Sequence, residues 1–461
     1  MNMGDEIVKK NKYEIDMCNG SIMDKLISFS LPLMLSGILQ LMFNAVDIVV
    51  VGRFSGSQAL AAVGSTTALI NVFTNLFIGI SLGANVLAAR YYAAGKTKEM
   101  SETVHTAIAL ALVSGVAMAV IGVVFARGAL EIMGTPDDVI AKSTLYMRIY
   151  FCGMPFFMMY NYGAAILRAV GDTKRPLIFL IVSGVINAVL NLFLVIVFHL
   201  DVAGVGIATV ISQLVSCILV LRCLHHTESS YQLHLAKLRI RSVYLKQIFE
   251  VGVPAGIQST VINISNAMLQ SSVNSFGSIA MAGYTASNNI FGFLYVSVNS
   301  FTQACMSFTS QNYGVKKLKR MDRVLIDCMI LSVVVTLILG SSVYIFGPEL
   351  LHIYSNQADV IKYGMEIFSY TTVTYFLCGL MDLFPGALRG MGYSTVPMIL
   401  SIIGTVGVRI IWIYGLFPSH RSLTFLFLSY PVSWIATIIM QVICFWFVRE
   451  KIHRTMVIAA E

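Results

Sequence analysis

The sequence predicts an all-α polytopic membrane protein with twelve transmembrane helices arranged in two six-helix lobes. Three observations support this fold class. The 461-residue chain is 57% hydrophobic and only 12% charged, whereas soluble domains carry about 25% charged residues. Apolar runs of roughly 20 residues, the length of a helix that crosses the hydrocarbon layer, recur along the whole chain. The two halves of the sequence also match one another, which predicts a duplicated unit.

The twelve spans are expected at about 26–50, 59–82, 103–126, 144–167, 177–198, 203–222, 247–273, 279–308, 325–347, 362–387, 396–417 and 424–447. Prolines fall within or beside five of them, and neighbouring helices can satisfy the backbone groups that such kinks release. These are Pro32, Pro155, Pro254, Pro385 and Pro431. The polar tail 1–24 lacks the apolar core of a signal peptide.

The basic residues predict the orientation. Most lysines and arginines, including Lys9 and Lys10 in the tail, fall in segments that share one side if both termini are cytoplasmic. Cytoplasmic loops carry such an excess, so a multi-pass protein of the cell (plasma or inner) membrane is expected. This bias also accounts for the net charge of +8. No nucleic-acid partner is therefore expected.

The sequence contains no pattern typical of an enzyme. The eight cysteines include no pair with CxxC spacing, and no nucleophile stands beside a base. "GVGIAT" at 204–209 follows no strand, so it is not a nucleotide loop. We expect no resident metal and no cofactor other than Na⁺ or H⁺ as a coupling ion.

An internal repeat divides the chain. At an offset of 221 residues, "LRAVGDTKRPLI" (167–178) falls on "LRGMGYSTVPMI" (388–399). One further residue of offset places Pro32 on Pro254 and Asn44 on Asn266. The expected organisation is an N-terminal lobe at 1–222, a cytoplasmic linker at 223–246 and a C-terminal lobe at 247–461.

Because each lobe has an even number of helices, the lobes are expected to be related by a pseudo-two-fold axis along the membrane normal. A cavity near the midplane would lie between them, and the lobes would rock to give alternating access. A static duplicated scaffold is the alternative.

Polar side chains at helical spacing predict which faces line that cavity. Each amide left in lipid would cost several kcal/mol. The cavity candidates are Gln40, Asn44, Asn71, Asn263, Asn266, Gln270, Asn288, Tyr295 and Asn299. Met158 and Tyr160, in "MPFFMMYNY", are candidates for its hydrophobic wall. The alternatives are interhelical hydrogen bonding for the amides and core packing for Met158 and Tyr160.

Asp47 is the most informative residue, because a charge at such depth costs about 2.5–3.5 kcal/mol and usually serves function. It could exchange a proton. Alternatively, its carboxylate and the amide oxygens of Asn187 and Asn191 could form a cage of hard oxygen ligands for sodium. A structural buried acid is the third possibility.

Two further charges lie deep in the second half. Asp382 falls at offset 221 from Asn161, so one half carries an acid where the other carries an amide. Arg409 is its expected charge partner, in a structural salt bridge or in a gating pair. Arg168 and Arg389, at span ends, are interpreted as anchors at the cytoplasmic interface.

Several of these segments together resemble the multidrug and toxic compound extrusion (MATE) family. They are "AVDIVVVGRFSGSQALAAVG" (45–64), "LRAVGDTKRPL", "LRGMGYSTVP" and the stretch that carries Asn187 and Asn191. The resemblance implies two six-helix lobes, a V-shaped cavity and export of cationic or amphiphilic compounds driven by sodium or protons. It assigns ion coupling to Asp47, Asn161, Asn187, Asn191 and, in some branches, Asp382.

The sequence departs from branches that carry an acid in the fifth or seventh helix, because amides stand there. The expected function is a non-enzymatic antiporter that works as a monomer in the lipid bilayer and exports small amphiphilic molecules. The alternative is a flippase for a lipid-linked sugar or phospholipid from the same wider superfamily. A pyrophosphate cargo should require several deep arginines, and only Arg409 and Arg148 are available.

Overall fold

The computed structural model describes residues 12–458, and all regular secondary structure in this range is helical. Lys9 and Lys10, used above to predict orientation, lie outside these residues. Eight of the described helices are long and apolar enough to cross a membrane, and a bent pair brings the number to nine. This pair is α12 (Ala358–Thr371) and α13 (Tyr375–Gly390), which meet at 52°.

The other three expected spans are not single helices of sufficient length and hydropathy, for two physical reasons. The helices α4 (Asp137–Cys152) and α5 (Met154–Ala169) are interrupted at Gly153, so neither alone reaches the length of a span. The helices α8 (Ser242–Asn274) and α9 (Ser278–Gly314) are long enough but carry the polar stripes that lower their hydropathy. With these included, the twelve-span all-helical fold class is confirmed.

The chain separates into two compact units. Unit 1 comprises the stretch ending at Met17 together with Leu35–Gly252, and unit 2 comprises Cys18–Met34 with the stretch beginning at Val253. The bounds of these units differ from the predicted lobe boundaries at 222 and 247 in two places. The first part of α1 belongs to unit 2, and the linker with the start of α8 belongs to unit 1.

The physical reason for this exchange lies at two prolines. Pro32 is inside α1 and Pro254 is inside α8, and each lies within three residues of a boundary between the units. A proline lacks the N–H that would close the helical hydrogen bond and allows the helix axis to bend. Each of these two helices can therefore pack its two parts into different units.

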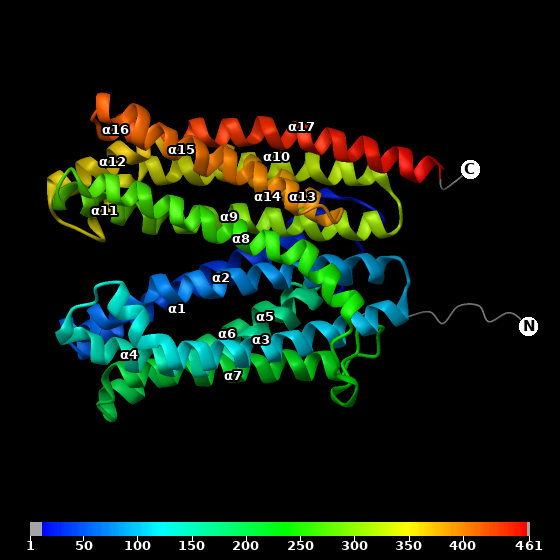
Figure 1. The fold of residues 1–461 in the computed structure, drawn as a ribbon, viewed down its shortest axis with the longest axis horizontal. Coiled ribbons are helices and arrows are strands. Elements are labelled where there is room, and N and C mark those ends of the chain that lie inside the picture. The colour runs from blue at the N-terminus through cyan, green and yellow to red at the C-terminus, as the bar shows by residue number, and fades with distance from the viewer. Residues whose placement is uncertain (1–11, 459–461) are drawn as a thin grey trace, which may run out of the picture. The chain divides into compact units, whose positions relative to one another are not determined.

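Unit 1 is built around α5, which packs against three other helices of the unit. Its helices besides α4 and α5 are α1 (Met23–Phe54, from Leu35), α2 (Ser57–Ala93), α3 (Thr97–Ile132), α6 (Lys174–Leu192) with the π-helical η1 (Phe193–Val197), α7 (Asp201–His225), the 3₁₀ turn η2 (Leu235–Lys237) and the start of α8. Within this unit α5 packs against α2, α3 and α7, and α4 packs against α2, α3 and α7 (Figure 1).

Unit 2 repeats this arrangement around α13. Its remaining elements are α10 (Leu318–Ile345), α11 (Gly347–His352), α14 (Thr395–Ser401), η3 (Ile402–Gly407), α15 (Val408–Ile411), η4 (Trp412–Leu416), η5 (Phe417–Ser419), α16 (Leu423–Phe427) and α17 (Ser429–Ile458). Here α13 packs against α9, α10 and α17, which mirrors α5 against α2, α3 and α7 in unit 1 (Figure 1).

The backbone confirms the sequence repeat at single residues. Gly56 and Gly277 both have positive φ, 86° and 99°, and Gly171 and Gly392 have 93° and 94°. Each pair is separated by 221 residues, the offset found in the sequence. A left-handed conformation favours glycine, so the two halves place their turns at equivalent positions.

Candidate functional site

The Asp47 site lies inside unit 1, between α1 and α6. Asp47 is 8% exposed, Asn187 is 5% exposed and Asn191 is fully buried. The side-chain amide of Asn191 donates to Asp47 Oδ1 and also to Asn187 Oδ1, at 3.2 Å in the second case. The predicted association of these three residues is thus present in the structure.

The ligand chemistry of this cluster is that of oxygen. The Asn191 amide oxygen is buried and accepts no hydrogen bond. Across residues 12–458, no lysine or arginine forms an ion pair with Asp47. A buried carboxylate whose hydrogen-bond donor is a neutral amide remains available to a proton or a small cation, because no fixed positive charge competes for it.

Two tyrosines that the sequence reasoning missed lie near this acid. Tyr146 and Tyr150 on α4 both interact electrostatically with Asp47, and their rings lie 6.3 Å apart. Their i, i+4 spacing places them on one face of the helix. This spacing was the available signal, but an aromatic pair in an apolar span is equally typical of core packing.

Other predicted residues of the first half are not part of this cluster. The Asn161 amide donates to the carbonyl of Phe157 in its own helix, at 2.8 Å. Met158 is fully buried, and Tyr160 is 6% exposed and donates to the carbonyl of Pro176. In this structure both side chains fill the interior of unit 1, and their assignment to a cavity wall stays a prediction.

In unit 1, Gln40 and Asn44 form a polar stripe on α1, and both are exposed, as is Asn71 on α2. Exposed amides within membrane spans cost free energy against lipid, so they favour a water-filled or protein-covered environment. Gln40, Asn44 and the buried Asp47 follow one another at helical spacing. The acid therefore continues the exposed polar stripe into the interior of the unit.

In unit 2, Arg409 occupies a buried position between α15 and its neighbours. It is 3% exposed, donates to Asn266 Oδ1 at 2.8 Å and lies 4.7 Å from the centroid of the Tyr430 ring. Two serines, Ser265 and Ser433, accept longer hydrogen bonds from it. Its partners are thus neutral amide, hydroxyl and aromatic groups.

The predicted pairing of Asp382 with Arg409 is wrong. Asp382 accepts a hydrogen bond from Tyr295 and interacts electrostatically with Arg389, two turns further along α13. Arg409 turns toward α8 and α17 instead, so the two charges face different neighbours. In this structure the basic residue associated with Asp382 is Arg389.

Arg389 also departs from its expected role as an interface anchor. It is 8% exposed, and its guanidinium donates to Gln258 Oε1 at 2.6 Å. The sequence did not indicate the association of Arg389 with Asp382, because Arg389 stands at the end of an expected span, where a snorkelling arginine is normal. The i, i+7 spacing of Asp382 and Arg389 was the signal that could have found their association.

The polar stripe of unit 2 runs along α8 and α9. Asn263, Asn266, Asn288 and Asn299 are exposed, Gln270 is half-buried and donates to Asn274, and Tyr295 is 46% exposed. Tyr295 thus joins the exposed stripe to the carboxylate of Asp382. The two units therefore each carry an exposed polar face with a deeper ionisable residue behind it.

The equivalent helix pairs of the two units carry opposite charges. In unit 1, Asp47 on α1 meets amides on α6. In unit 2, the helices related by the repeat, α8 and the α14–η4 span, bring Asn266 to Arg409. The contact between the equivalent helices therefore holds a carboxylate from the first helix in unit 1 and a guanidinium from the second helix in unit 2.

A separate polar cluster closes unit 1 outside the membrane spans. Asp172 pairs with Arg175, and Tyr231 donates to Glu14 at 2.6 Å. Burial raises the pKa of Asp172, and the pairing with Arg175 opposes this. Burial and the hydrogen bond to Glu14 raise the pKa of Tyr231 to about 12. This cluster holds the tail against unit 1 and lies apart from Asp47.

No group of three histidine, cysteine, aspartate or glutamate side chains suited to a metal ion occurs among the described residues. The Asp47 site differs from such a group because two of its three members are amides.

The family model named MatE matches residues 32–193 and 254–414, so each half of the repeat is matched once. A probable multidrug resistance protein of Bacillus subtilis, YoeA, is 30% identical over 389 residues, which are 83% of this chain and 84% of that protein. The multidrug export protein MepA of Staphylococcus saprophyticus is 23% identical, over 86% of this chain and 88% of that protein.

Solved structures share the fold. An outward-facing multidrug resistance MATE family transporter of the MOP superfamily has a TM-score of 0.86 at 19% identity, covering 97% of this chain and 99% of the other. A MOP superfamily transporter from Pyrococcus furiosus has a TM-score of 0.87 at 20% identity, covering 96% of this chain and 99% of the other.

Proposed function

This chain belongs to the MATE family, and from this we propose that it is a secondary active antiporter that exports amphiphilic, mostly cationic organic compounds in exchange for sodium or protons. Its curated relatives are described as multidrug resistance or multidrug export proteins. The chain is a multi-pass membrane protein. We propose that both of its termini face the cytoplasm and that one chain suffices for transport.

The observation that carries this proposal is the buried acid at Asp47. Its side chain is 8% exposed and its hydrogen-bond donor is the neutral amide of Asn191. A charge at this depth is costly unless it is neutralised. Binding of a proton or a sodium ion would neutralise it, and release of that ion would restore the cost, so occupancy can bias the conformation of the surrounding helices.

The two candidate ions would use the same residues differently. A proton needs only the carboxylate of Asp47, with Asn191 as the donor to the ionised form. Sodium would need several hard oxygen ligands, and the carboxylate of Asp47 with the amide oxygens of Asn187 and Asn191 supplies them. Rotation of the Asn191 amide would then present its oxygen in place of its nitrogen.

The preference for cationic or neutral cargo rests on the exposed polar stripes. Amides provide both donors and acceptors without a fixed charge. The stripe of unit 2 adds the ring of Tyr295 and, behind it, the carboxylate of Asp382. Aromatic faces attract cations, so this face combines two features that suit an amphiphilic cation.

Efflux from proteoliposomes would test this function. Ethidium efflux should be driven by an imposed proton gradient or by an imposed sodium gradient in the wild type. The Asp47→Asn variant should fall to the rate of protein-free liposomes, because an amide cannot lose a proton and holds sodium poorly. Asp359→Asn, which removes an exposed acid at the start of α12, is the matched control and should transport normally.

Coupling through Asp47 would be refuted if Asp47→Asn and the wild type transported equally under both gradients. If neither gradient drives efflux of any cationic dye by the wild type, the antiport proposal itself is refuted.

One observation favours the second candidate function, a flippase for a lipid-linked sugar or phospholipid. Arg409 is buried with only neutral partners, so it could receive a phosphate group. A single site of this kind is less than a pyrophosphate cargo requires, since Arg148 is exposed and donates to the carbonyl of Val123. Translocation of a fluorescent phospholipid by the same proteoliposomes would favour this function.

A further inference from the structure

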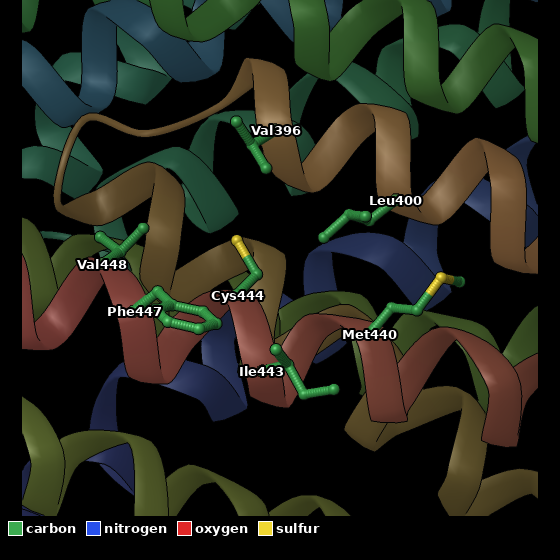
Figure 2. Close-up of a pocket in the computed structure, with 7 residues that line it drawn as sticks. All are labelled: Val396, Leu400, Met440, Ile443, Cys444, Phe447 and Val448. Atoms are coloured by element: carbon green, nitrogen blue, oxygen red, sulfur yellow. The ribbon is translucent and has the colours of Figure 1, made fainter.

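An apolar groove lies in unit 2, between α14 and α17. It has a volume of about 380 Å³, within the range of roughly 300–1,000 Å³ that is usual for small-molecule sites. Val396 and Leu400 on α14 face Met440, Cys444 and Phe447 on α17 (Figure 2). Every side chain that lines the groove is apolar.

The floor of the groove is part of the packed core. Cys444 is 8% exposed and belongs to a cluster with Leu388 and Met391, against which Leu400 and Val448 pack. The rim is different, because Val396, Ile443 and Phe447 are all exposed. The groove is therefore a fixed depression with an open side, which a chain of methylene groups can enter from the bilayer.

At one end of the groove, Lys451 on α17 lies near Tyr393, which precedes α14. Cys444, Phe447, Val448 and Lys451 follow one another at helical spacing on one face of α17. Lys451 lies with its ammonium 5.9 Å from the centroid of the Tyr393 ring. Tyr393 stands two residues before the start of α14, so the lysine and the tyrosine lie at one end of the groove.

The charge of Lys451 is free to take a partner. Its neighbour Arg449 pairs with Asp322 and Arg454 pairs with Glu450. Lys451 is exposed, and among residues 12–458 it forms no ion pair with a carboxylate. An apolar groove that ends at an uncompensated ammonium matches a molecule with a long hydrocarbon chain and an anionic head.

We propose that this groove is a binding site for an anionic phospholipid, with one acyl chain between α14 and α17 and the headgroup phosphate at Lys451. Under the proposed orientation, α17 ends at the cytoplasmic surface, where anionic lipids and basic juxtamembrane residues attract one another. The site does not take the exported cation, because its lining offers no negative or polar group.

Native mass spectrometry of the full-length protein, extracted from bilayers of equal parts phosphatidylglycerol and phosphatidylcholine, tests this site. The wild type should retain phosphatidylglycerol at least several-fold more than phosphatidylcholine. Lys451→Gln should abolish this preference. Lys319→Gln, which removes an exposed lysine at the same membrane side of unit 2, should keep it.

A second pair of variants tests the acyl-chain part of the groove. Leu400→Trp should fill it and lower retention of both lipids, whereas Ile399→Trp, at an exposed neighbouring position outside the groove, should not. Equal retention of the two lipids by the wild type would overturn the proposal. So would a Lys451→Gln protein that keeps the preference, or equal losses in Lys451→Gln and Lys319→Gln. Because the readout is binding, none of these outcomes depends on the transport activity.

Discussion

At the level of single residues, the deep charges of this chain are held mainly by neutral groups. Asp47 is held by an amide, and Arg409 by an amide, two hydroxyls and an aromatic ring. Asp382 accepts a hydrogen bond from the hydroxyl of Tyr295 and also interacts with the charge of Arg389. A neutral partner lowers the cost of burial without locking the charge into a permanent ion pair. This leaves the charge free to respond to an ion or a cargo.

The partners of Asp382 can be tested by double-mutant cycles. Asp382→Asn combined with Tyr295→Phe should show a coupling free energy of about 0.5–3 kcal/mol, because the two side chains share a hydrogen bond. Asp382→Asn combined with Arg409→Gln should be additive within about 0.5 kcal/mol. Chemical unfolding in detergent measures both cycles. Strong coupling to Arg409 and none to Tyr295 would contradict the structure.

Gly171 provides a second test at the residue scale. Its φ is +93°, and a Cβ there would lie 2.5 Å from the carbonyl oxygen of Ile15 in the tail. Gly95 also has a positive φ but has nothing within 4 Å of such a Cβ. Both alanine variants should pay about 1–3 kcal/mol for the left-handed backbone. Gly171→Ala should lose about 1–3 kcal/mol more from the clash.

Thermal unfolding of the two variants in detergent measures this difference. Equal losses in Gly171→Ala and Gly95→Ala would mean that the tail does not pass over the turn at Gly171.

Tyr231 predicts a dependence of stability on alkaline pH. Its folded pKa of about 12 lies above the ordinary tyrosine pKa of 10.0, so the folded protein holds the phenolic proton more tightly than the unfolded chain does. The resulting stabilisation, at most about 2.7 kcal/mol for two pKa units, is complete below pH 10. It is lost as the pH rises through 12.

The melting temperature of the wild type should therefore fall between pH 10 and pH 12, and Tyr231→Phe should reduce that fall. Tyr354→Phe, which alters a tyrosine that is 46% exposed, is the control and should follow the wild type. Identical pH profiles for the wild type and Tyr231→Phe would show that the phenol is not held in this way.

At the level of the elements, the start of α8 is packed against α2 through two glycines. A Cβ at Gly83 would lie 2.1 Å from the carbonyl oxygen of Ile248, and one at Gly252 would lie 2.5 Å from the Cα of Ile80. The helix backbones approach one another this closely only because both positions lack a side chain. This contact assigns the first part of α8 to unit 1.

Gly83→Ala should consequently destabilise the protein by about 1–3 kcal/mol through overpacking. Gly64→Ala, in the same helix, has nothing within 4 Å of its Cβ and should be neutral or stabilising by up to about 1 kcal/mol. Thermal unfolding in detergent compares them. If Gly83→Ala is as stable as Gly64→Ala, the crossing of α2 and α8 is looser than the structure has it.

Most elements could be predicted from the sequence, because hydropathy over about 20 residues decides where a helix can cross the bilayer. The exchange of the first parts of α1 and α8 could not be. Hydropathy marks a span without saying which neighbours it packs against, and Pro32 and Pro254 signalled a bend but not its consequence. Sequence likewise does not distinguish cavity lining from core packing at Met158 and Tyr160, which are buried.

The site was predicted in part. Asp47, Asn187 and Asn191 could be grouped because helical spacing and an intramembrane acid restrict the possibilities. The association of Asp382 with Tyr295 and Arg389 depends on side-chain directions across α9 and α13, and sequence spacing does not fix these. Opposite charge alone suggested Arg409, which is satisfied elsewhere.

At the level of the whole molecule, a duplication has produced two units with similar backbones and different charges. Paired positive-φ residues recur 221 residues apart. The contact between equivalent helices holds the acid Asp47 in unit 1 and the base Arg409 in unit 2. Because only unit 1 places an acid between its equivalent helices, we propose that unit 1 alone exchanges the coupling ion there. The face of unit 2 would then contribute to cargo binding.

Ion release on cargo binding is the measurement that tests this account most directly. Purified protein in weakly buffered detergent solution would be titrated with ethidium while a pH electrode and a sodium electrode record the ion released. The wild type should release one proton or one sodium ion per chain, and Asp47→Asn should release none, whereas Asp382→Asn should still release it. Undiminished release from Asp47→Asn would contradict the central claim that this buried acid carries the coupling ion.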